Sequence, residues 1–141
     1  MSHRRVVVTG MGAVTPLGND LASTWEGVVN GRSGIGPVTH FDTTGFTTRI
    51  AGQIRDFDPT TFVPPKDAKK MEPFIHYGLA ASFMALDDSG LEITEANADR
   101  IGAIIGSGIG GILSIEEQTA KFLEGGARKI LRAGWVSPAM M

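Results

Sequence analysis

The 141-residue sequence contains no cysteine, which excludes disulfide bonds, thiolate metal sites and any reaction that uses a cysteine nucleophile. The sequence also lacks a large excess of charge of either sign. The 13 basic and 15 acidic side chains nearly balance, so no overall field would attract nucleic acid. Its histidines (His3, His40 and His76) have no spacing typical of metal ligands. We therefore expect no metal or other cofactor, and any electrostatic docking must depend on a local patch.

A long apolar run is also lacking. The run after the basic start covers only residues 6–8, far too short for the core of a signal peptide. No segment approaches the ~20 apolar residues that a membrane span needs. Because 42% of the residues are apolar, enough for a hydrophobic core, we expect a soluble, cytoplasmic protein without a membrane partner.

The first half of the chain predicts strand, helix, loop and strand. Residues 4–9 hold three valines and end at a glycine, which favours a strand buried on both faces. Asn19 or Asp20 can cap a following helix, and Gly31 is placed to end it. Glycine, serine and threonine predict a surface loop after that helix, and residues 49–54 can form a second strand.

In the second half, a long helix is expected over residues 66–89 and a third strand over residues 101–105. The core-facing stripe of that helix is predicted to be Met71, Ile75, Leu79, Ser82 and Leu86. A further helix follows the glycine run at residues 106–111 and ends at the double glycine, residues 125–126. Strands separated by helices indicate a mainly parallel α/β layer within one domain.

Two glycine motifs have alternative interpretations. Gly10 and Gly12 suggest a dinucleotide-binding turn, but Thr15 stands in place of the third glycine, so a tight turn with close packing is favoured. The glycine run suggests a phosphate loop, but Ile112 follows it where a lysine is required. Either a plain turn or a close approach to a ligand remains open there, with Ile109 as the single large side chain.

Basic residues gather at two places. Lys66, Lys69 and Lys70, the lysine cluster, are spaced to lie on one helix face near a helix start, where cations are disfavoured. That placement invites a functional explanation, although a solvated charged face is the simpler alternative. Arg128 and Lys129 form a second, smaller basic spot after the double glycine.

The order of several motifs resembles the β-ketoacyl-acyl-carrier-protein synthases, especially the type II elongating enzymes of bacteria. The matching segments are residues 4–12, 15–19, 40–43, 51–52, 69–71, 88–91, 100–102 and 106–111. They occur in the same order and at similar intervals as in that family. The resemblance spans about residues 2–130.

This resemblance implies the amino-terminal part of a thiolase-like α/β fold with αβαβα layers, whose members form homodimers. Such enzymes move an acyl chain from acyl carrier protein to a cysteine and decarboxylate malonyl-carrier protein. The carbanion then extends the chain by two carbons, while two histidines stabilise the enolate oxygen. Ile109 matches a residue that lines the far end of the acyl pocket. The lysine cluster, with Arg128 and Lys129, resembles the patches that bind the acidic carrier protein.

The chain also departs from the family. The family's cysteine and both histidines are expected beyond residue 141, so residues 1–141 would form a partial domain without catalytic residues. Residues 131–141 stop resembling the family. We expect a truncated or frame-shifted product that is inactive alone, with a divergent short protein as the alternative. Other interpretations are a non-catalytic fragment that binds carrier protein or dimerises, and a thiolase acting on coenzyme A thioesters.

Overall fold

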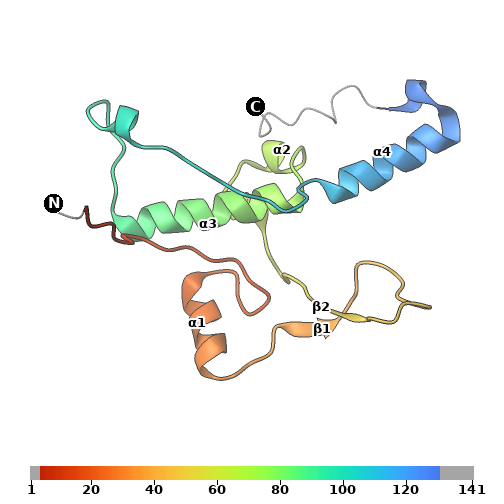
Figure 1. Cartoon of the computed structure of the whole chain (residues 1–141), viewed down its shortest axis with the longest axis horizontal. Coiled ribbons are helices and arrows are strands. Elements are labelled where there is room, and N and C mark those ends of the chain that lie inside the picture. The colour runs from red at the N-terminus through yellow and green to blue at the C-terminus, as the bar shows by residue number, and fades with distance from the viewer. Residues whose placement is uncertain (1–3, 131–141) are drawn as a thin grey trace.

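The computed structural model describes residues 4–130 and arranges them around one long helix, α3 (Figure 1). The helices are α1 (Leu21–Val29), α2 (Pro65–Ala68), α3 (Pro73–Ser89) and α4 (Ile112–Gly125), with short 3-10 helices η1 (Pro59–Thr61), η2 (Ala98–Arg100) and η3 (Ala127–Lys129). The strands are β1 (Ile35–Pro37) and β2 (Ile50–Gly52). Within this part of the chain, no helix is long and apolar enough to cross a membrane. His3 and residues 131–141, where divergence is expected, lie outside the described residues.

The predicted first helix is confirmed as α1. Its cap is Asp20, whose Oδ1 accepts a hydrogen bond from the Ser23 backbone N–H over 2.7 Å. Gly31 follows the helix with a φ of 62°, a left-handed conformation that glycine adopts without strain. Both ends of α1 are therefore encoded by residues within or next to the helix.

The sheet among the described residues is a small antiparallel pair. β1 pairs with β2 so that Ile35 faces Gly52 and Pro37 faces Ile50. β2 lies within the predicted second strand, whereas β1 lies in the segment predicted to be a loop, so that part of the prediction is wrong. The glycines and prolines near β1 resemble a turn composition, yet they allow this short edge pairing.

The predicted first and third strands are not formed, and the predicted mainly parallel layer is therefore absent from residues 4–130. Residues 4–10 and 102–109 make no backbone hydrogen bond with other described residues. Their apolar side chains face outward, with Val6 93% exposed and Ile104 99% exposed. A strand exists through hydrogen bonds to a neighbouring strand, and these two segments have no such neighbour here.

The predicted continuous helix over residues 66–89 is also wrong, because it divides into α2 and α3. Pro73 begins α3, where its missing N–H costs nothing, and it disfavours helical geometry at Glu72 before it. The lysine cluster consequently lies on α2 and in the turn after it, outside the first turns of the long helix.

The two extended segments pack on one face of α3. Gly10 and Gly12 approach the helix so closely that a Cβ on either would collide with a helix carbonyl oxygen, which confirms the close-packing interpretation. Ile105 lies against Gly78, further toward the start of the helix, and Figure 1 shows both segments running along α3. The residues of α3 that meet these segments or the adjoining Gly12 and Gly110 include Phe74, Gly78, Ala81, Ala85 and Ser89.

This packed face differs from the predicted core-facing stripe of the helix. Ser82 and Leu86, which belong to the predicted stripe, are exposed. Small side chains bring the helix backbone close to an extended chain, so the small-residue face is covered in preference to the larger apolar one. Ala80, fully buried at 0% exposure, is next to this face.

Candidate functional site

The lysine cluster stands on the surface at the corner between α2 and α3. All three lysines are exposed. Lys70 pairs with Asp67 over 3.1 Å, an exposed ion pair that contributes about 0–1 kcal/mol. Within residues 4–130, Lys66 and Lys69 form no ion pair. The corner therefore presents two uncompensated ammonium groups to a partner.

The corner under the cluster is one of the best-packed parts of the described chain. Val63 and Ala68, which flank Lys66, are only 8% and 7% exposed. The imidazole Nε2 of His76, on α3, lies 2.9 Å from the Ala68 carbonyl oxygen. Because a carbonyl oxygen only accepts, Nε2 must carry the hydrogen. This bond ties the last residue of α2 to the long helix.

An aromatic cluster joins the preceding segment to α3. Phe57 stacks on Phe62 with ring centroids 6.1 Å apart and meets Tyr77 edge-on at 5.2 Å. Asp58 caps η1 between the two phenylalanines, and its hydrogen bond from the Thr60 hydroxyl is the main reason why the pKa of Asp58 is lowered. These contacts fix the chain that leads into α2, so they also fix the direction of the lysine cluster.

The second basic spot lies elsewhere. Arg128 and Lys129 belong to η3, and Figure 1 shows η3 at the far end of α4, apart from α2. Lys129 also pairs with Glu124 over 3.6 Å. In the described part of the chain, the structure therefore does not bring the two basic spots together into one patch.

Ile109 lies in a bend of the glycine run and is 68% exposed, so nothing among residues 4–130 encloses its side chain. The loop that carries it nevertheless ends close to the lysine corner. Gly110 lies against the Phe74 ring, 3.5 Å from where its Cβ would be. Gly111 is so close to the Glu72 carboxylate that a Cβ would collide with it. The structure thus places the Ile109 loop next to the turn that follows the cluster.

Sequence reasoning missed two residues that hold this arrangement. Glu72 places a carboxylate at the start of α4, where the helix dipole favours negative charge. The bond from His76 to Ala68 depends on the fold of α2 back against α3, which no spacing in the sequence describes. The only advance signal was Pro73, which predicts a corner between the two helices. No cluster of metal-ligating side chains occurs in the described residues.

Solved structures of ketosynthases resemble this chain in overall fold. The ishigamide ketosynthase/chain length factor aligns with 94% of this chain at a TM-score of 0.75 and 30% identity. A β-ketoacyl synthase from Burkholderia phymatum aligns with 95% at 0.73 and 29% identity. A type II polyketide ketosynthase in complex with its acyl-carrier protein gives 0.70 and 27% identity over 90%. These likenesses confirm the predicted class, the amino-terminal part of a thiolase-like α/β fold.

The family model of the β-ketoacyl synthase N-terminal domain matches residues 3–140, so this chain belongs to the β-ketoacyl synthase family. The chain is 55% identical over 130 residues to a 3-oxoacyl-[acyl-carrier-protein] synthase 2 of Vibrio harveyi. It is 47% identical over 126 residues to the protein of that name from a Synechocystis strain. These alignments cover 92% and 89% of the chain but only 31% and 30% of the relatives. The predicted family is confirmed.

Proposed function

We propose that this chain forms the carrier-protein docking part of a β-ketoacyl-acyl-carrier-protein synthase, an acyltransferase of fatty-acid synthesis. The family reaction condenses acyl and malonyl-carrier protein to β-ketoacyl-carrier protein. The observation that carries the proposal is the exposed lysine cluster, held on a well-packed corner beside the Ile109 loop. Cations opposite an acidic carrier protein speed and orient its docking.

Catalysis by the 141-residue chain alone is not part of the proposal. The condensation needs a thiolate to receive the acyl group, and the sequence contains no cysteine. We therefore assign no catalytic residue to this chain. This absence supports a second candidate function, a non-catalytic module that binds carrier protein or dimerises. A thiolase-type reaction on coenzyme A thioesters would not require a carrier-protein patch.

For Ile109 we propose the family role at the far end of the acyl pocket. The support is the glycine run at residues 106–111, which resembles that of the family to which this chain belongs. The high exposure of Ile109 then requires covering groups from outside residues 4–130. Arg128 and Lys129 would form a separate docking contact. A homodimer would cover part of the exposed apolar surface, and the cytoplasm suits a chain without disulfides.

The docking proposal is tested by titrating the purified chain with acyl carrier protein at several salt concentrations. We expect salt-weakened binding, and Lys66→Ala and Lys69→Ala should each lower the affinity by about fivefold, the effect of about 1 kcal/mol. The matched control is Arg100→Ala, because Arg100 is exposed on η2 at the opposite end of α3 (Figure 1). Binding that ignores salt or both lysines would contradict the proposal, and chain extension by this cysteine-free chain would refute its inactivity.

A further inference from the structure

The short helix that carries the lysine cluster cannot be stable on its own. α2 has four residues, and its start has no side-chain cap. A helical turn of this length is unfavourable in isolation because nucleation fixes several residues for one hydrogen bond. The orientation of Lys66 and of the following lysines must therefore come from contacts that α2 makes with the rest of the chain.

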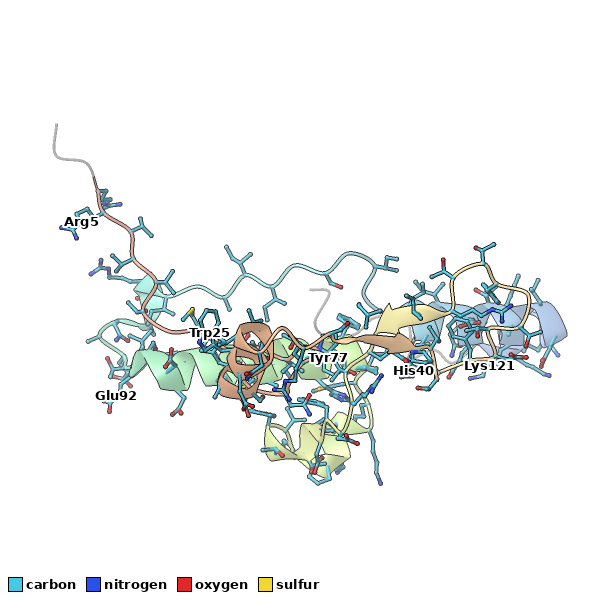
Figure 2. All side chains as sticks on the ribbon, turned by 90° about the horizontal axis from the view of Figure 1, so that it is seen from below. Arg5, Trp25, His40, Tyr77, Glu92 and Lys121 are labelled. Atoms are coloured by element: carbon cyan, nitrogen blue, oxygen red, sulfur yellow. The ribbon has the colours of Figure 1, made fainter. Side chains whose placement is uncertain are left out.

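The contact best placed to supply that orientation is the bond from His76. Its Nε2 donates to the carbonyl of Ala68, which lies between Lys66 and Lys69 in the sequence. Ala68 is buried and His76 is half-buried, so water competes less for this bond than for an exposed one. Figure 2 labels Tyr77, the next residue along α3, and shows it near the centre of the molecule. The imidazole thus acts from a helix that is already fixed by the aromatic cluster.

We propose that His76 is a positioning residue of the carrier-protein docking surface. This inference rests on the docking function proposed above. His76 does not itself meet the carrier protein. Its ring N–H holds the end of α2 in place, so that Lys66 and Lys69 reach the acidic partner with their directions already set. Such preorganisation strengthens binding because less side-chain and backbone freedom is lost when the partner arrives.

The test compares two substitutions of His76 in the 141-residue chain. His76→Leu keeps the bulk and removes the donor, whereas His76→Gln keeps an N–H at a similar reach from the helix. For acyl carrier protein we expect about fivefold weaker binding by H76L, the effect of one net hydrogen bond, and binding within about twofold of the unsubstituted chain by H76Q. Because the number of charges at the surface is unchanged, the salt dependence should keep its slope in both variants.

A lysine variant distinguishes this role from direct contact. Lys66→Ala should weaken binding and also reduce the salt dependence, since it removes a charge. If H76L binds like the unsubstituted chain while K66A binds weakly, the positioning role is wrong and the docking function stands. Should the unsubstituted chain show no salt-weakened binding, the docking function fails and the His76 role fails with it. Weak binding by H76Q in a folded chain would also overturn the inference.

Amide hydrogen exchange checks where the structure changes. In H76L, exchange should become faster in α2 and residues 69–72, while α1 serves as an internal control and keeps its protection. If exchange in H76L is faster everywhere, the chain has unfolded. H76Q then decides alone, because retained affinity supports the hydrogen bond as the positioning element and lost affinity excludes it.

Discussion

The lysine corner and the two extended segments differ in how far their contacts are satisfied within this chain. At the corner, η1, α2 and the start of α3 hold one another through rings, a capped turn and the His76 bond. Residues 4–10 and 102–109 instead lie on α3 without a single backbone hydrogen bond to other described residues. Val63 and Ala68 of the corner are buried, whereas the valines and isoleucines of the segments face outward.

The difference lies in where each region finds its partners. The ring contacts and the His76 bond of the corner join residues that are close in the sequence, and local contacts cost little loop entropy. The segments have the composition of inner strands, which need neighbours on both sides and cover on both faces. Since the chain spans about 31% of the relatives, we infer that the neighbours lie in the part of the family fold that this chain does not contain.

The largest effect should come from blocking the unpaired segments. We expect the isolated chain to self-associate, because exposed apolar segments with free backbone groups pair with other copies. The double substitution Val6→Lys with Ile104→Lys should weaken association by about a hundredfold or more, since each buried side chain contributes about 1.5–3 kcal/mol. Sedimentation velocity measures this. Val29→Lys, at an exposed position on α1, is the control, and a monodisperse unsubstituted monomer would contradict the prediction.

An intermediate effect is expected where a segment touches α3. Gly12→Ala would place a methyl group against the Ala81 carbonyl oxygen, and overpacking of this kind costs about 1–3 kcal/mol. Gly106→Ala is the matched control, because nothing lies within 4 Å of its added carbon. That control should be neutral or stabilise the chain by up to about 1 kcal/mol. Urea unfolding compares the two, and equal free energies of unfolding would show that residues 10–12 do not pack on α3.

How far the fold follows from the sequence depends on the range of the contacts. α1 and the end of α4 were predicted because their caps and terminating glycines lie beside them. The strands over residues 4–9 and 101–105 were predicted from composition, but a strand depends on partners that composition does not specify. The break before α3 was visible in Pro73, and it was missed because the apolar spacing continued across it.

The residues of the candidate site could be predicted from the sequence, but the contacts that hold them in place could not. The lysine cluster and Ile109 can be named from the sequence, and the family that suggests their roles is confirmed. The sequence does not predict that the lysine cluster and the Ile109 loop lie at one corner. That placement depends on how Glu72 meets Gly111 and how His76 reaches Ala68. These contacts follow from the turn between two helices, which no periodic pattern describes.

The smallest effect concerns the cap of α1, which depends on neither region. Hydrogen bonds from Ser23, first from its backbone and then from its hydroxyl, lower the pKa of Asp20. The ionised carboxylate therefore stabilises the fold fully above the ordinary value of 3.8, and this contribution is lost as pH falls through the lowered folded-state pKa. Asp20→Ala should cost about 1 kcal/mol at neutral pH, whereas Asp20→Asn keeps a capping oxygen.

The pH dependence of D20N isolates this cap from the other carboxylates, which titrate equally in both chains. Thermal unfolding should show that any advantage of the unsubstituted chain over D20N shrinks in acid, because only the carboxylate loses its charge. Parallel melting profiles across the acid range would exclude the carboxylate as the cause. Since the cap is local to α1, the same profile should persist when V6K and I104K are also present, and its loss there would show that α1 depends on the unpaired segments after all.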